Sequence, residues 1–275
     1  MTSGKLRIMA IGAHPDDCDV KVGGTAILYA RAGHQVKFVS ATNGDTGHHQ
    51  MGGGVLARRR FAEAQEAAET AGIEYEVLDI HNGQLLPTLE NRWQIVRIIR
   101  EFAPDIVITH RPNDYHPDHR YTSQIVQDSA YTITIPNVAA LTPALEQNCV
   151  FAYMSDDFTK PCAFQADVTV VIDDVLDDKM RMLACHESQF FEWLPFNRSQ
   201  GQVPDGHAER LSWLTERQAP RFASVAEKHR ESIASFYGPE RAAGARHAEA
   251  FEICEYGRRP CRGELYRLFP FFDGP

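Results

Sequence analysis

Short apolar runs alternate with longer helical patterns along the first two thirds of the chain. The apolar runs cover residues 6–12, 36–41, 75–80, 106–110, 150–153 and 168–172. Each run is too short for a buried helix, and continuous apolar runs are typical of central parallel strands that are covered on both faces. Residues 55–71 are rich in strong helix formers and end before Gly72, a residue suited to a helix C-cap. Residues 91–102 show helical spacing before Pro104.

This alternation predicts an α/β fold with a mostly parallel, doubly wound sheet and the common strand order 3-2-1-4-5. We expect one domain over residues 1–275, with its core at about 6–188. Beyond that core the periodicity gives way to aromatic and proline-containing sequence, a helical stretch near 219–236, and a Gly/Arg/Pro-rich tail. Residues 189–275 are therefore expected to be a C-terminal elaboration of the same domain.

Two similar tetrapeptides follow the first and fourth predicted strands. They are His14-Pro15-Asp16-Asp17 and His116-Pro117-Asp118-His119. In the expected strand order the first and fourth strands are neighbours, and such sheets bind ligands beyond the carboxyl ends of the strands at this switch point. Proline in the second position suits the first turn of a helix, so the first and fourth residues of each tetrapeptide should face the same side. We therefore expect both tetrapeptides to meet at one site.

The side chains of this site are typical of a metal-dependent hydrolase. His14 and Asp17, together with His116 and His119, form a His/carboxylate cluster of the kind that binds zinc, with three protein ligands and an open fourth position. The spacing alone does not separate His116 from His119 as the third ligand. The carboxylates of Asp16 and Asp118 and the remaining imidazole are left for acid and base work.

Composition excludes several other classes of partner. The net charge is −9 and no block of Lys or Arg stands out, so nucleic acid is not expected as a partner. No stretch approaches the roughly 20 apolar residues that span a bilayer, and no apolar leader follows the N-terminus. Six cysteines without a C-x-x-C pair do not indicate a disulfide framework. We expect a soluble, cytoplasmic protein, and the sequence is compatible with a homo-oligomer.

Three other functions fit the residues less well. A dehydrogenase of this fold would carry G-x-G-x-x-G after its first strand, where this chain has Gly12-Ala13-His14-Pro15. A magnesium-dependent phosphoryl-transfer enzyme would use oxygen ligands, whereas imidazoles lie at both ends of this cluster. A structural zinc module would have a closed Cys/His site, whereas this cluster is rich in carboxylates.

At this point the sequence resembles a known family. Similar elements are Ala13 to Asp17 after a strand, Gly23-Gly24-Thr25, Arg60-x-x-Glu63, and Asp114-x-His116-Pro117-Asp118-His119. Together they look like the LmbE-like, or PIG-L, family of N-acetylglucosaminyl deacetylases, over roughly residues 6–130, with a weaker likeness at 179–189. The resemblance implies a Rossmann-like fold and the zinc-dependent removal of an acyl group, usually acetyl, from an amino sugar.

The resemblance also implies a role for each residue of the two tetrapeptides. His14, Asp17 and His119 would hold one zinc ion per chain. Asp16 would be the general base, and His116 would stabilise the oxyanion and protonate the departing amine. Asp118 is placed to orient an imidazole. Cys18 stands where the family often has Glu or Ala, and we expect it to pack in the core rather than to bind metal.

The substrate contacts are less clearly marked. Candidates are Arg60 on the predicted helix, Asp114 before the second tetrapeptide, His186 in a His-x-Ser-Gln motif, and Asn43 and Asp45 in the loop of residues 42–49. Trp193 could reach the pocket from the C-terminal region, although core packing explains a tryptophan equally well. The expected substrate is a small amino sugar or its conjugate. A thiol-sugar conjugate amidase or a tailoring deacetylase for a natural product would have the same site.

Overall fold

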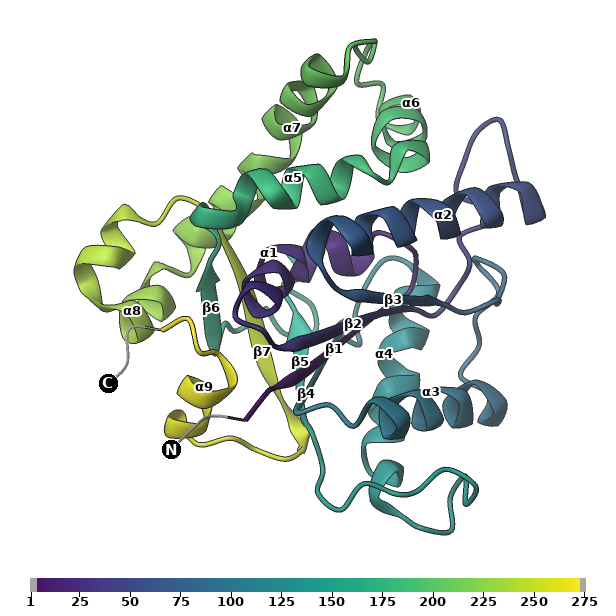
Figure 1. Cartoon of the computed structure of the whole chain (residues 1–275), viewed down its shortest axis with the longest axis vertical. Coiled ribbons are helices and arrows are strands. Elements are labelled where there is room, and N and C mark those ends of the chain that lie inside the picture. Colours follow the sequence, from purple (N-terminus) through teal and green to yellow (C-terminus); the bar gives the residue numbers. More distant parts are fainter. Residues whose placement is uncertain (1–3, 273–275) are drawn as a thin grey trace.

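A seven-stranded sheet in the order β3-β2-β1-β4-β5-β7-β6 forms the centre of the protein (Figure 1). The structure is a computed structural model and describes residues 4–272. The strands are β1 Arg7–Gly12, β2 Gln35–Ser40, β3 Glu74–Val77, β4 Ile106–Thr109, β5 Val150–Met154, β6 Val168–Val171 and β7 Ala248–Gly257. Strands β1 to β5 pair in parallel, and β7 is antiparallel to both β5 and β6. The predicted fold class and the order 3-2-1-4-5 are confirmed.

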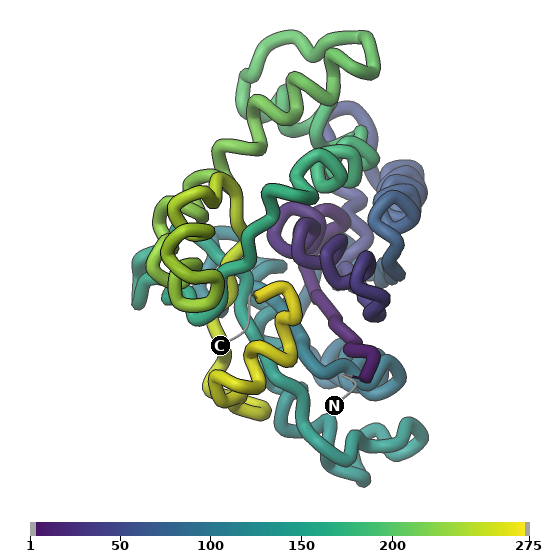
Figure 2. The backbone as a smooth tube through the Cα atoms, turned by 60° about the vertical axis from the view of Figure 1, so that its left-hand side comes forward, coloured from purple at the N-terminus to yellow at the C-terminus, as the bar shows by residue number. Residues whose placement is uncertain are grey.

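Helices cover both faces of the sheet. They are α1 Asp17–Arg31, α2 Gly53–Ala71, α3 Leu89–Phe102, α4 Pro117–Ala130, α5 Leu176–Ala184, α6 Leu194–Asn197, α7 His207–Lys228, α8 Arg230–Gly244 and α9 Arg262–Leu268. Helices α1, α2 and α5 lie on one face, and α3 and α4 on the other (Figure 1). The segment that joins α6 to α7 projects furthest from the sheet (Figure 2). Among residues 4–272 no helix has both the length and the hydropathy to cross a membrane.

The central strands are largely apolar because their side chains contribute to two cores. On β1, Ile8 and Ala10 belong to the core beneath α1 and α2, whereas Met9 and Ile11 belong to the core beneath α3 and α4. Successive side chains of a strand point to opposite faces, so a strand buried on both sides has no polar positions. This double burial produces the continuous apolar runs of the sequence.

The C-terminal region differs from its sequence-based description. The helical stretch expected at 219–236 is two helices, α7 and α8, which meet at His229. Residues 248–257, expected to belong to a tail, form the strand β7 between β5 and β6. Glutamates occur at every third position of β7, and the first of them, Glu249, is 2% exposed. A charged residue inside the sheet requires a partner.

That partner is a buried lysine on α5. Lys179 is fully buried, and its ammonium group is paired with the carboxylate of Glu249 and lies 3.6 Å from the ring centre of Phe222. Glu249 also accepts hydrogen bonds from the backbone N–H groups of Gly24 and Thr25, both at 2.8 Å. One ion pair therefore joins β7, α5 and the middle of α1.

We expect Glu249→Gln to lower the free energy of unfolding by about 3 to 5 kcal/mol, because it leaves the Lys179 ammonium buried without a counter-charge. Urea unfolding at neutral pH measures this change. The control is Asp178→Asn, which breaks pairs with exposed arginines and should cost less than about 1 kcal/mol. Equal losses in the two variants would contradict the structural role assigned to the buried pair.

Candidate metal centre and active site

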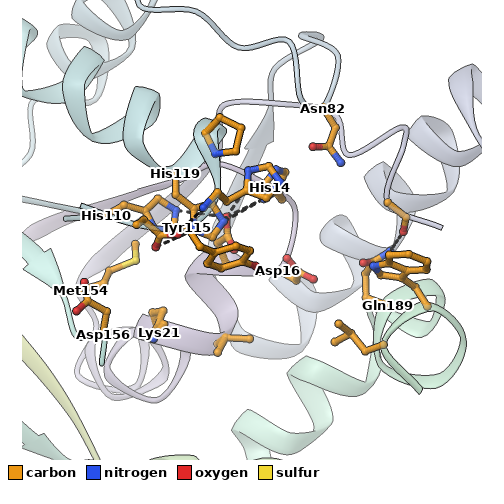
Figure 3. Close-up of a pocket in the computed structure, with 18 of the residues that line it drawn as sticks. His14, Asp16, Lys21, Asn82, His110, Tyr115, His119, Met154, Asp156 and Gln189 are labelled. Atoms are coloured by element: carbon orange, nitrogen blue, oxygen red, sulfur yellow. Dashed lines mark hydrogen bonds and ion pairs between the residues drawn. The ribbon is translucent and has the colours of Figure 1, made fainter. Parts of the chain in front are cut away.

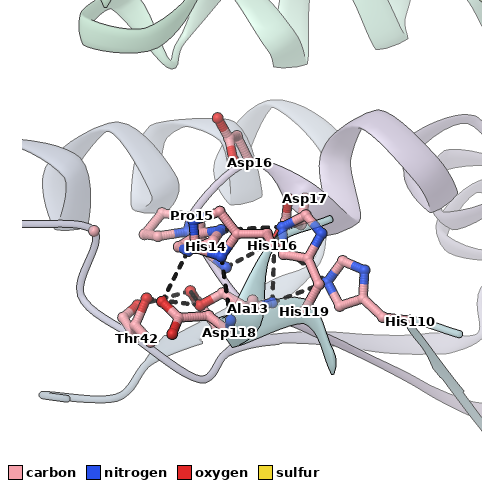
Figure 4. A network of polar contacts seen from close by, with 12 residues as sticks. Ala13, His14, Pro15, Asp16, Asp17, Thr42, His110, His116, Asp118 and His119 are labelled. Carbon is pink, nitrogen blue, oxygen red and sulfur yellow. Dashed lines mark hydrogen bonds and ion pairs between the residues drawn. The ribbon is translucent and has the colours of Figure 1, made fainter. Parts of the chain in front are cut away.

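The parallel pairing of β1 with β4 brings the two tetrapeptides together (Figure 4). The second tetrapeptide begins α4 as expected, with His116 at the N-cap and Pro117 at the first helical position. The expectation for the first one is wrong, because α1 begins only at Asp17 and Pro15 lies in the preceding turn. That turn closes when the Asp17 carboxylate accepts the N–H groups of Ala13 and His14 at 3.0 and 2.8 Å.

Three ligand atoms form a nearly equilateral triangle at this point. His14 Nδ1 lies 3.3 Å from Asp17 Oδ2 and 3.3 Å from His119 Nε2, and the remaining side, from His119 Nε2 to Asp17 Oδ2, is 3.4 Å. Ligands bound at 2.0 to 2.2 Å to a tetrahedral metal are about 3.3 to 3.6 Å apart. The donor set and its spacing therefore fit a divalent transition metal.

Hydrogen-bond partners orient the two imidazoles of the triangle. Asp118 is fully buried, and its Oδ2 lies 3.2 Å from His14 Nε2 and accepts the N–H of Gly83 at 2.6 Å. This contact places the His14 proton on Nε2 and leaves Nδ1 free for a metal. His119 Nδ1 lies 3.1 Å from Asp114 Oδ2, which leaves Nε2 facing the cluster. Carboxylate partners of this kind are typical of metal-binding histidines.

The electrostatics of the cluster favour an added positive charge. Burial lowers the pKa of His119, but the carboxylates of Asp17 and Asp114 outweigh it and raise the pKa to about 10. The His119 ring, which lies between the two carboxylates, therefore binds its proton strongly. A metal cation would replace that proton and gain the same attraction.

Asp16 is held beside the cluster in an uncommon backbone conformation. It is the N-cap of α1 with φ 124°, and its carboxylate lines the pocket, 16% exposed (Figure 3). Burial raises the pKa of Asp16 to about 6 against the opposing charge of Arg60, whose Nη2 lies 3.5 Å from Asp16 Oδ2. Arg60 also donates to the carbonyl oxygens of Pro15 and Gly44, at 2.5 and 3.2 Å. Arg60, expected among the substrate contacts, lines the pocket but is engaged in holding Asp16 and its turn.

A buried chain of contacts supports the backbone of Asp16. The Asp16 N–H donates to Tyr75 Oη at 3.2 Å, and Tyr75 donates to Asp19 Oδ2 at 3.0 Å. Asp19 Oδ1 lies 3.0 Å from Nε2 of His186, and both residues are fully buried. His186 was also expected to contact substrate, but the structure places it behind Asp16, away from the pocket surface.

The other expected substrate residues have partners within the protein. Asn43 donates to Asp79 at 2.9 Å, and Asp45 lies 2.5 Å from His81 Nδ1. Neither Asn43 nor Asp45 lines the pocket, and they instead shape the loop after β2. Asp114 lines the pocket but is engaged with His119.

Sequence reasoning missed His110. Its Nε2 lies 3.3 Å from Asp17 Oδ2 and accepts the N–H of Ala13 at 3.1 Å, and its ring stacks on His119 with centres 4.2 Å apart. His110 is the last residue of the apolar run 106–110, so the pattern assigned it to the strand. Its position directly after β4, at the switch point, was the signal. Cys18 is buried in the hydrophobic core, as expected.

The cluster opens into a cavity of about 630 Å³. The first part of the chain contributes the metal cluster, Asp16, Asn82 and Tyr115, and the C-terminal region contributes Trp193, Arg198 and Arg221 among others. Figure 3 shows Lys21 and Asp156 on the His110 side of the cluster, and Asn82 and Gln189 on the other side. Trp193 thus reaches the pocket from the C-terminal region.

Comparisons with known proteins find similarity to deacetylases and to an amidase. The family model described as "GlcNAc-PI de-N-acetylase" matches residues 9–130. Diacetylchitobiose deacetylase of Thermococcus kodakarensis is 32% identical over 210 residues, which are 70% of this chain and 75% of that protein. Mycothiol S-conjugate amidase of Streptomyces coelicolor is 31% identical over 147 residues, 44% of this chain and 50% of that protein.

Solved structures share the fold. The N,N'-diacetylchitobiose deacetylase of Pyrococcus horikoshii has a TM-score of 0.71 to this structure at 24% identity, over 91% of this chain and 84% of that one. This likeness extends well beyond the residues matched by the family model. The C-terminal region therefore follows the same general path in both proteins.

We expect the protein to bind about one divalent metal ion per chain, and Asp118→Asn to weaken that binding about 10- to 100-fold through its contact with His14. Titration with zinc in a competing chelator measures the affinity. The control is Asp128→Asn, an exposed aspartate on the same helix, which should bind metal as the wild type does. A protein that stays metal-free in zinc would exclude the metal centre.

Proposed function

Because the chain belongs to the PIG-L (LmbE-like) family of deacetylases, we propose that it is a zinc-dependent hydrolase that removes an N-acyl group, usually acetyl, from an amino sugar of the N-acetylglucosamine type. One observation carries this proposal above the others. The triangle of His14, Asp17 and His119 opens into the same cavity as the largely buried carboxylate of Asp16. A metal site and a base in one cavity are what amide hydrolysis by water requires.

The donor set favours zinc over magnesium. Two imidazoles and one carboxylate are common zinc ligands and leave the fourth position of a tetrahedral site open, whereas magnesium prefers oxygen ligands. A zinc ion held there would act as a Lewis acid, which lowers the pKa of water and polarises a carbonyl group. This donor set also argues against phosphoryl transfer as the function.

Asp16 is proposed as the general base. A base works best when its pKa lies near the working pH, and burial brings the pKa of Asp16 to about 6. The ionised carboxylate takes a proton from the attacking water as the new C–O bond forms at the acyl carbon. The protonated carboxyl group then delivers this proton to the amine nitrogen as the C–N bond breaks.

His116 is proposed to stabilise the oxyanion. Its Nδ1 accepts the N–H of Asp118 at 3.2 Å, so the proton of the neutral ring is on Nε2. Burial and the imidazoles of His14 and His119 lower the pKa of His116 to about 4. Such a ring is neutral near pH 7 and donates a hydrogen bond from Nε2. The family resemblance implies that His116 also protonates the departing amine. Because its ring is neutral near pH 7, we propose His116 for the oxyanion and give the amine proton to Asp16 instead.

Substrate assays distinguish the acylated amines that fit this site. A thiol-sugar conjugate amidase or a tailoring deacetylase would use the same cluster and base. Release of free amine from N-acetylglucosamine, its conjugates, acetylated glycopeptides and acetylated nucleosides distinguishes these substrates. Absence of free amine with every compound, from zinc-loaded protein, would overturn the proposal.

We expect Asp16→Asn to keep its zinc while amine release falls about 10²- to 10⁴-fold, because the base is lost but the three ligands are unchanged. Zinc content and turnover are measured on the same preparation. His14→Ala serves as the comparison, since it should lose both zinc and turnover. Near wild-type turnover in Asp16→Asn would remove Asp16 from the role of base.

We expect Tyr75→Phe to lower kcat about 2- to 10-fold with KM and zinc content unchanged, since it removes one hydrogen bond from the backbone of the base. The matched control is Tyr153→Phe, which removes a buried hydroxyl that bonds to Gln127 away from the cavity. Equal effects of the two changes on kcat would show that Tyr75 contributes to stability alone.

A further inference from the structure

The carboxylates that line the cavity all have partners of opposite charge within the protein. Asp156 lies 3.0 Å from Arg111, and Asp157 lies 2.5 Å from Lys228. As described above, Asp114 is engaged with His119, Asp16 with Arg60, and Asp17 with the histidines of the cluster. The acidic groups of the cavity are therefore neutralised or committed to the metal site.

Three cations of the same cavity have no such partner. Lys21, Arg198 and Arg221 line the cavity, and no carboxylate among residues 4–272 lies within 4.0 Å of their charged nitrogens. Lys21 Nζ donates to the carbonyl of Ser155 at 2.7 Å, and Arg221 Nη1 donates to the side chain of Gln218 at 3.2 Å. Neither acceptor carries a charge, and carboxylates such as Asp157 act on Lys21 and Arg221 only from beyond ion-pair distance.

The three cations come from separate parts of the chain. Lys21 lies on α1, one turn after Asp17, while Arg198 ends α6 and Arg221 lies on α7. Arg198 and Arg221 are exposed at the mouth of the cavity, and Lys21 is half-buried. They affect one another, because loss of contact with water and the charge of Arg198 lower the pKa of Arg221, and burial and Arg221 lower the pKa of Lys21, while Asp157 opposes both shifts. In a chain of net charge −9, the cavity lining is less acidic than the chain as a whole, with five Lys and Arg side chains against five carboxylates.

We propose that the substrate carries an anionic oxygen group, a carboxylate or a phosphate, on the portion attached to its amino sugar, and that Lys21, Arg198 and Arg221 bind this group. This inference rests on the proposed function, since it places the acyl group at the metal cluster and the rest of the substrate toward α6 and α7. Guanidinium groups match the planar oxygens of carboxylates and phosphates, and an anion relieves the repulsion among the cations.

The test compares glycosides of N-acetylglucosamine that differ in charge. The acidic compounds are the carboxymethyl glycoside and the 1-phosphate, and the neutral one is the methyl glycoside. We expect kcat/KM to be about 10- to 100-fold higher for at least one acidic compound than for the neutral one. The preferred acidic compound identifies carboxylate or phosphate as the group. A neutral glycoside that is hydrolysed as efficiently as both acidic ones overturns the proposal.

The double variant Arg198→Met/Arg221→Met assigns the preference to the cavity cations. We expect it to reduce the ratio of acidic to neutral kcat/KM to near one. The matched control is Arg92→Met/Arg97→Met on α3, which also removes two positive charges without an ion-pair partner, but outside the cavity. A ratio that survives in the cavity variant, or falls equally in the control, overturns the assignment.

A binding measurement separates this proposal from the deacetylase itself. Calorimetric titration with glucosamine 1-phosphate and methyl glucosaminide requires no turnover. Tighter binding of the phosphate that is lost in Arg198→Met/Arg221→Met supports the cationic subsite even if no acetylated compound is hydrolysed. Because phosphate also binds metals, tight binding that persists in the cavity variant assigns the phosphate to the metal centre and overturns the subsite.

Discussion

The pairing of β1 with β4 is the constraint on which the site depends. The two strands are about 100 residues apart in the sequence, yet their register places Ile11 beside Thr109, so both chains leave the sheet at the same edge. His14 and Asp17 follow one strand, and His110 and His119 follow the other. No single segment holds the metal cluster, and any change that separates these strands would separate the ligands.

Much of this arrangement could be predicted because it follows from local patterns. Doubly buried strands read as apolar runs, and their alternation with helices fixes a small set of topologies, so the meeting of the tetrapeptides was foreseeable. The partners of Arg60 and His186 could not be predicted, because they depend on which side of a turn faces the cavity. The sequence did not predict β7, because the buried glutamate of this strand is paired with Lys179, a residue far away in the sequence.

Different hydrogen-bond partners give residues of the same type different protonation patterns. His14 and His116 are both histidines that begin a tetrapeptide, but Asp118 contacts them differently. Its carboxylate faces His14 Nε2, whereas its N–H binds His116 Nδ1. One aspartate therefore leaves Nδ1 of the first ring without a proton, as the proposed metal site requires, and places the proton of the second ring on Nε2, as the proposed oxyanion contact requires.

The residues proposed for the reaction and those proposed for substrate choice come from different parts of the chain. The family model ends at residue 130, and the proposed metal ligands, the proposed base Asp16 and His116 all precede that residue. The opposite wall of the cavity includes Trp193, Arg198 and Arg221. Glu249 and Lys179 bond to the helix that begins at Asp17, and the Lys179 ammonium also lies against Phe222, the neighbour of Arg221 on α7. The buried ion pair therefore connects the part of the wall that carries Arg221 to the helix that begins at the proposed ligand Asp17.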